Sequence, residues 1–247
     1  MTYAEHTSFL ASLDSFPKEA FLPGPGATRE ECGFFLALAV IHNDLKDIVL
    51  GQVLLSEVPV PALSPLTPTR GQYGGLDSHL LRTLGGLMHE LLEVIRAHSS
   101  VLSGRLFQEA HRKCPKEGKK AWKAICDAAD GTVSSDPLSK ALFFVRNKVS
   151  FHYDVKALLQ GYESAFSQPR FGPPMLSRGN SMRESRFYFA DAAAQAYLFE
   201  KTGADGTAPL FAWSTDHSGH VNHALHWLVL KFIETRGFTF REYCERT

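Results

Sequence analysis

The apolar positions of the chain recur mainly at helical spacing. Over residues 31–55 the large apolar side chains alternate at spacings of four and three, which places them on one stripe of a helix. The members of this stripe are Phe34, Leu38, Ile41, Leu45 and Ile48. Thr28 and Glu31 have the spacing of a capping box and mark the start of the helix. We expect this apolar stripe to pack against other helices.

A second stripe predicts one long helix over residues 77–113. Its apolar face consists of Leu80, Leu84, Leu87, Leu91, Val94, His98 and Val101. Gly85-Gly86 and Gly104 are points at which this helix could bend, and Cys114-Pro115 is expected to end it. His98 lies on the apolar stripe, so we expect a hydrogen-bonded core histidine there. The preceding residues, 58–75, are rich in proline and glycine and predict a loop.

Four further helices complete the pattern. Residues 117–130 form a shorter helix that Gly131 closes, and Asp136-Pro137 opens a helix that extends to about residue 166. Later helices are predicted over about 190–203 and about 217–236, each followed by glycine.

The predicted fold class is therefore mainly α, with a four-helix bundle-like core, long loops and a C-terminal helical extension. We expect residues 1–166 to form the helical bundle domain, with its core at about 31–166. Residues 167–247 begin with a loop rich in Pro, Gly, Ser and Arg, and continue as the C-terminal helical extension, packed on the same domain.

Composition narrows the class of protein. The 247 residues suit one large domain, and 26 basic residues balance 26 acidic ones, which argues against a protein that coats nucleic acid but not against a local basic site. The four cysteines form no CxxC pair and are expected to be free thiols in a reducing compartment. No signal peptide is evident, and the longest apolar run is far short of the roughly 20 residues that span a bilayer, so we expect a cytoplasmic protein without a membrane partner.

The strongest candidate for chemistry is RNKVSFHYD, residues 146–154. The Arg146 guanidinium suits a phosphate, Asn147 adds an amide, and His152 can exchange a proton near neutral pH. These groups suffice to cut a phosphodiester beside a 2′-hydroxyl, because they supply a proton carrier and a cation for the developing charge. This reaction requires no metal and no other cofactor.

The pattern Arg146-Asn147, four residues, His152 resembles the R-polar-x4-H signature of the HEPN superfamily. Proteins of that superfamily are helical bundles, and many are metal-independent endoribonucleases of defence or toxin–antitoxin systems. The resemblance covers about residues 31–166 and implies that Arg146 and His152 are catalytic and that Asn147 positions the phosphate or the arginine. It also implies RNA as substrate, a homodimer whose site is built from two protomers, and an antitoxin or other protein partner.

Basic residues near the motif are the candidates for substrate binding. Lys148 lies within it, and Arg170, Arg178 and Arg183 make the loop at 167–185 locally basic. On a regular helix Arg146 and His152 would lie about 120° apart around the axis and about 9 Å apart along it, so a long arginine, a kink or a partner protomer must close the gap.

Two alternative functions are open, one with the same residues and one with a separate group of histidines. In a non-catalytic interaction or sensor module, Arg146 to Lys148 would form a solvated helix face and His152 would be a half-buried structural residue. In a metal-binding protein, the ligands would be the histidines that recur at every third position: His217, His220, His223 and His226. They precess by about 180° around a helix and need a break at Gly219 to meet one ion. Without a metal, Asp216 would cap the helix and some of these histidines would pack against Trp227 and Phe211.

Overall fold

The computed structural model describes residues 14–57, 68–131, 139, 155–167, 173–178, 181, 185–203 and 207–242, without the side chains of 68–70, 202, 207–214 and 242. These residues are mainly α-helical, as the sequence predicts. The helices are α2 (Arg29–Ser56), α3 (Pro68–Ala97), α4 (Ser99–Ser103), α5 (Arg105–Lys113), α6 (Lys116–Ala129), α8 (Val155–Ser167), α9 (Tyr188–Thr202) and α10 (Thr207–Thr235). A 3-10 helix, η1 (Lys18–Phe21), precedes them. The short strands β1 (Asp14–Ser15) and β2 (Arg241–Glu242) pair antiparallel.

Helix α2 begins at the predicted capping box. The Thr28 hydroxyl accepts a hydrogen bond from the Glu31 amide at 3.1 Å, and the Thr28 amide donates to the Glu31 carboxylate at 2.8 Å. Two amides that the helix itself leaves unpaired are thereby satisfied. The predicted apolar stripe faces inward, since Phe34, Leu38 and Leu45 are almost fully buried.

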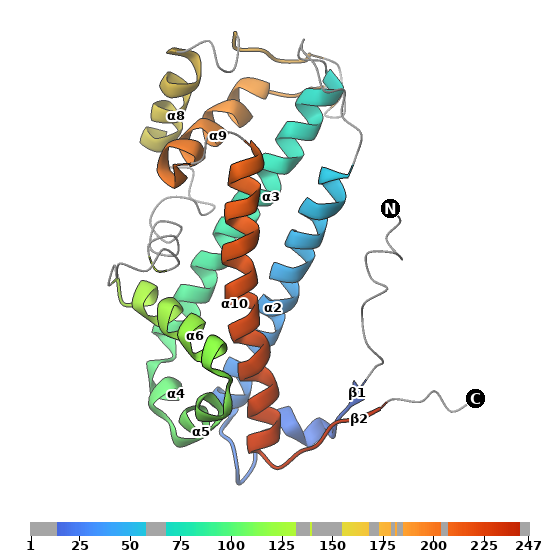
Figure 1. Cartoon of the computed structure of the whole chain (residues 1–247), viewed down its shortest axis with the longest axis vertical. Helices are drawn as coiled ribbons and strands as arrows, with labels where there is room; N and C mark the ends of the chain where they lie inside the picture. The colour runs from blue at the N-terminus through green and yellow to red at the C-terminus, as the bar shows by residue number, and fades with distance from the viewer. Residues whose placement is uncertain are drawn as a thin grey trace, which may run out of the picture.

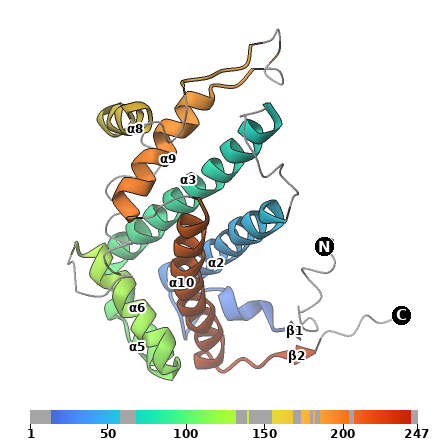
Figure 2. The same ribbon diagram turned by 45° about the horizontal axis from the view of Figure 1, so that its top comes forward.

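The C-terminal helix α10 forms the middle of the bundle. It contacts α2, α5 and α6 and passes in front of α3, antiparallel to α2 (Figures 1 and 2). The rings of Phe35 and Phe232 stack with their centroids 4.1 Å apart, and Phe35 also lies against Phe107. Val221 and Leu225 are fully buried in the same hydrophobic cluster. The part of α10 from Val221 to Ile233 thus shares one core with α2, α3 and α6.

The two remaining helices form a separate layer. Helix α8 packs on α9, and α9 in turn contacts α3, so the pair lies beside the end of the bundle at which α3 begins (Figure 2). Of the helix predicted over 137–166, the described residues contain mainly this last part, α8. Among the described residues, none of the helices combines the length and apolar character needed to cross a membrane.

The prediction of one helix over residues 77–113 was wrong in its continuity. The chain leaves helical geometry at His98, with φ −118° and ψ 36°, and again at Gly104, with ψ 148°. His98 Nδ1 lies 2.9 Å from the carbonyl oxygen of Val94, and the His98 ring packs beside Phe34. Both contacts are those expected of a core histidine. These breaks let α5 turn back under α10, where Phe107 enters the core.

The predicted loop at 58–75 was also too long, because α3 begins at Pro68. Proline is well placed at the first helical position, where its missing N–H is not needed. The prediction that glycines end α6 and α9 was correct: Gly131 and Gly203 have φ of 79° and 71°. Helix α10 ends before Gly237, as predicted, but begins ten residues earlier than expected.

Candidate functional site

The residues of the predicted nuclease motif lie outside the described residues. These are Arg146, Asn147, Lys148 and His152, and two of the loop arginines, Arg170 and Arg183, lie outside them as well. What the structure does describe is the helix that follows the motif, since α8 begins at Val155, three residues after His152.

Helix α8 is held against α9 by backbone-close packing. Its inner face carries the small buried residues Ala157, Gly161 and Ala165. A Cβ at Gly161 would overlap the carbonyl oxygen of Ala193 on α9, so no larger residue fits without moving one helix. The outer face instead exposes Val155, Leu159 and Tyr162, with exposed fractions of 78%, 57% and 37%. Helix α8, which follows the motif, therefore packs closely on α9 through its inner face and exposes apolar side chains on its outer face.

The arginines of the loop at 167–185 and just beyond it differ in their surroundings. Arg178 is exposed, as a residue that binds substrate would be. Its neighbour Ser177 pairs with Arg186 through two backbone hydrogen bonds of 2.9 and 3.3 Å. The Arg186 side chain turns to the protein: Nη2 lies 2.9 Å from Asp191 Oδ2, and Nη1 donates to Gln72 at 3.0 Å. Arg186 is thus engaged in a structural ionic network.

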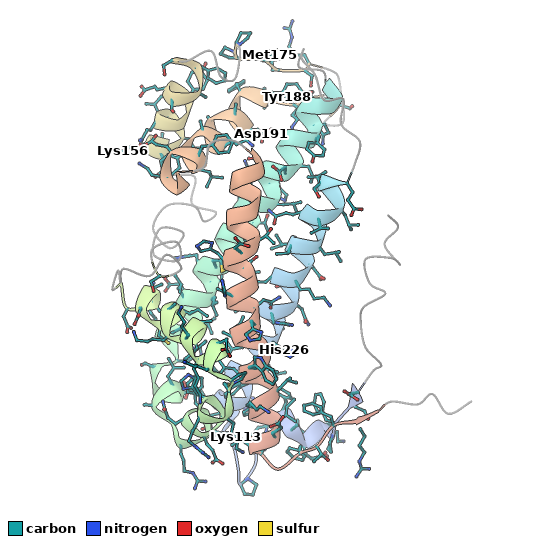
Figure 3. The ribbon with its side chains drawn as sticks, viewed as in Figure 1. Lys113, Lys156, Met175, Tyr188, Asp191 and His226 are labelled. Carbon is teal, nitrogen blue, oxygen red and sulfur yellow. The ribbon has the colours of Figure 1, made fainter. Side chains whose placement is uncertain are left out.

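The same network reaches α3 through Arg82. Its guanidinium donates to the Ser78 hydroxyl at 2.9 Å and lies 3.7 Å from the other oxygen of Asp191. Asp191 is therefore placed between two guanidinium groups, near the N-terminus of α9 (Figure 3). A carboxylate is favoured there both by the two cations and by the positive end of the helix.

Two glycines of α3 explain why these side chains come so close. A Cβ at Gly71 would overlap the ring of Tyr188, and a Cβ at Gly75 would overlap the guanidinium of Arg186. The two glycines are four residues apart, so they lie on one face of α3. The stretch GQYGG thus belongs to helix α3, and its glycines let Tyr188 and Arg186 pack closely against the helix backbone.

Asp77 is the most perturbed carboxyl of this region. It is 5% exposed, and its Oδ2 has no hydrogen-bond partner in the part of the chain that the structure describes. Burial raises the pKa of Asp77 from 3.8 to about 6. Ser78 and Gln52 are also buried, on the neighbouring ends of α3 and α2. Asp77 is therefore a carboxyl that changes protonation near neutral pH in a closed, partly polar interior.

The four histidines of α10 do not form one cluster, because α10 continues through Gly219 without a break. His220, His223 and His226 are exposed, and His223 Nε2 accepts a hydrogen bond from Trp227 at 3.2 Å. Among the described residues no group of three or more His, Cys, Asp or Glu is placed to hold a metal ion. A spacing of three residues does not match the helical repeat of 3.6, so the four histidines point in different directions around the helix.

One histidine of α10 has a partner that the sequence pattern missed. The ring of His226 lies 5.7 Å from the ring of His42 on α2, and His42 Nδ1 lies 3.2 Å from the carbonyl of Asn222. A carbonyl only accepts, so Nδ1 carries the proton in this arrangement. Burial lowers the pKa of His42, partly offset by that hydrogen bond, and the nearby His226 and Lys46 lower it further. The sequence separation between His42 and His226 hid this pair.

Comparisons of the chain with protein-family models, with curated proteins and with solved structures found no match. The inference of function therefore depends on this chain's own residues. The sequence patterns missed the contact of Arg82 with Asp191 and that of His42 with His226, because the two residues of each pair are far apart in the chain. The one local sequence signal was the spacing of Gly71 and Gly75. If a helix begins at Pro68, this spacing predicts a helix face on which other side chains can pack closely.

Proposed function

We propose that this protein is a metal-independent endoribonuclease of the HEPN type, with its active site in RNKVSFHYD. The observation that carries the proposal is the sequence motif, Arg146-Asn147 followed by His152. Two structural features support it: the mainly helical bundle, and the firm packing of α8 directly after the motif. We also propose that the protein acts in the cytoplasm, which suits the free thiols of Cys32, Cys114 and Cys126.

The proposed reaction is an attack of the 2′-hydroxyl on the adjacent phosphate. His152 removes the proton of the attacking oxygen, the new O2′–P bond forms and the P–O5′ bond breaks, and a protonated histidine returns a proton to O5′. The products are a 2′,3′-cyclic phosphate and a 5′-hydroxyl. Arg146 stabilises the charge that develops on the phosphate oxygens, and Asn147 holds the phosphate or the arginine.

A homodimer completes the proposed site. On a regular helix Arg146 and His152 would lie about 120° apart, so the proposed site pairs the arginine of one protomer with the histidine of the other at an interface. The exposed apolar side chains of Val155 and Leu159 follow the motif directly and would favour burial there. A protein antitoxin that covers the same surface would inhibit the enzyme.

The test is cleavage of total RNA by purified protein in EDTA. Wild-type protein is expected to cut RNA and to leave 2′,3′-cyclic phosphate ends, whereas His152→Ala and Arg146→Ala should lose about 10²-fold or more in rate. His220→Ala is the matched control, because His220 is an exposed histidine outside the motif. Equal cleavage by wild type and His152→Ala would refute the proposed site.

A non-catalytic interaction module is the second candidate. The observation that favours it is the exposed apolar face of α8, formed by Val155, Leu159 and Tyr162, because such faces commonly bind other proteins. If folded wild-type protein cuts no RNA but Leu159→Asp abolishes self-association or partner binding, this second function is the correct one.

A further inference from the structure

A strongly basic segment lies far from the predicted motif in the sequence. Residues 112–123 contain six of the 26 basic residues of the chain and one acidic residue, Glu117. Because the whole chain has no net charge, this excess of five positive charges is local. The segment connects the end of α5 to the first half of α6, and Lys113 marks its place at the end of the molecule opposite α8 (Figure 3).

Helix α6 divides cleanly into a buried face and a lysine face. Lys116, Lys119, Lys120 and Lys123 follow the spacing of one helical stripe. The opposite stripe is buried in the core and consists of Gly118, Ala121, Trp122, Ile125 and Ala128. Because the core holds that stripe, the lysines point to solvent: three of them are exposed and Lys119 is partly exposed. We call these four lysines the α6 lysine face.

Few carboxylates balance this face. Lys123 pairs with Asp127 at 2.6 Å, and Lys113 pairs with Glu109 at 3.6 Å. Within the part of the chain that the structure describes, Lys116, Lys119 and Lys120 form no ion pair. Like charges three and four residues apart destabilise a helix by about 0.2–0.5 kcal/mol for each pair, so the arrangement costs stability that a purely structural role would not require.

The positive charge extends from α6 toward α5. Lys119 acts on two groups at the end of α5, since its charge, after burial, lowers the pKa of His111 and opposes the burial that raises the pKa of Cys114. The exposed Arg112 lies in the same turn of α5. The C-terminus of α5 and the N-terminus of α6 meet here, and their opposite helix dipoles largely cancel, so the side chains determine the potential.

We propose that the α6 lysine face binds the phosphate backbone of RNA and holds the substrate at a distance from the cleavage motif. The choice of RNA rests on the proposed nuclease function, whereas the choice of a polyanion rests on the geometry and charge of the face. From Lys116 to Lys123 the stripe spans about 10 Å, which is long enough to contact neighbouring phosphates.

The salt dependence of binding follows from the number of phosphates contacted. Each phosphate contact on a single strand contributes about 0.7 to the slope of log K against log salt, so contacts by Lys116, Lys119 and Lys120 would contribute a slope of about −2. Reversing two of these lysines should reduce the slope by about 1.4 and weaken binding by more than about 10-fold at 0.1 M salt.

The experiment measures binding of a fluorescein-labelled 20-nucleotide RNA by fluorescence anisotropy. The protein is the full chain with His152→Ala, so that the RNA stays intact. The test variant adds Lys116→Glu with Lys120→Glu, and the control adds Lys18→Glu with Lys46→Glu. The control pair is also exposed and changes the net charge equally, but lies on η1 and α2. Circular dichroism checks each fold, and Lys116→Gln with Lys120→Gln provides a milder second variant.

The test pair should weaken binding by more than about 10-fold, the glutamine pair by a smaller factor, and the control pair by less than about threefold. Equal losses for the test and control pairs would overturn the proposal, because net charge alone would then explain binding. Binding to vesicles of anionic lipid without binding to RNA would also overturn it.

The outcome is separable from that of the proposed nuclease. If wild-type protein with an intact motif cuts RNA while the lysine variants bind and cut normally, the binding surface is refuted and the nuclease stands. If binding depends on the lysine face but no variant or wild type cuts RNA, the binding surface stands and the nuclease is refuted.

Discussion

Replacing Asp77 by asparagine should make the stability of this protein less dependent on pH. Asp77 is 5% exposed and its pKa rises from 3.8 to about 6 because burial disfavours the charged form. Between these two values the folded state binds more protons than the unfolded state, so stability is lost as pH rises. At pH 7 the raised pKa of Asp77 costs about 3 kcal/mol of folding free energy, and at pH 5 it costs roughly half as much.

The quantity to measure is therefore a difference between two pH values. Asp77→Asn should gain about 1 kcal/mol more in free energy of unfolding at pH 7 than at pH 5, relative to wild type. Any constant cost of burying an amide cancels in this comparison. Urea unfolding, followed by circular dichroism at several pH values, gives the free energies. Asp44→Asn is the control, since it removes an exposed carboxylate from α2. A gain that is the same at pH 5 and pH 7 would show that Asp77 is not a buried titrating group.

Three further predictions concern packing, capping and a second titrating group. Gly161→Ala should destabilise the fold by about 1–3 kcal/mol, because the added Cβ overlaps a carbonyl of α9. Gly33→Ala, with open space around the added Cβ, should instead stabilise α2 by about 0.5–1 kcal/mol. Thermal unfolding of both variants tests this difference, and similar shifts in unfolding temperature for both would contradict it. Thr28→Ala should cost about 1 kcal/mol in urea unfolding through loss of the capping box, and a neutral result would show that the cap contributes nothing. His42→Gln should reduce the loss of stability that occurs as pH falls below 6.5. Burial lowers the pKa of His42, so the unfolded chain takes up the proton at a higher pH than the folded chain does. The free energy of unfolding at pH 7 and at pH 5 measures this effect, and an equal difference in wild type and variant would refute it.

The local features of the chain were readable in its sequence. The stripe from Phe34 to Leu45 and the capping box at Thr28 depend only on residues within a few turns of one another, so the pattern alone predicts helix α2 and its inner face. The same holds for the helix ends before Gly131 and Gly203, where a left-handed residue closes the helix. The mainly α fold follows from the sum of such local signals.

What the tertiary structure decided involves residues far apart in the chain. Stacking of Phe35 on Phe232 puts the C-terminal helix in the middle of the bundle, although its sequence resembles that of any amphipathic helix. Arg186 belongs to a stretch that looks basic in sequence, yet Asp191 and Gln72 draw its side chain into the protein.

The two candidate sites also differ in whether the sequence alone or the tertiary structure identifies them. The motif from Arg146 to His152 is a short local pattern, and the sequence alone proposed its chemistry. The lysines of α6 form a visible charge run in the sequence, but only the burial of Trp122 and its neighbours on the opposite side fixes them as one outward face. A periodic pattern determines which side chains share a face of a helix, whereas the packing of distant segments determines whether that face meets the core or the solvent.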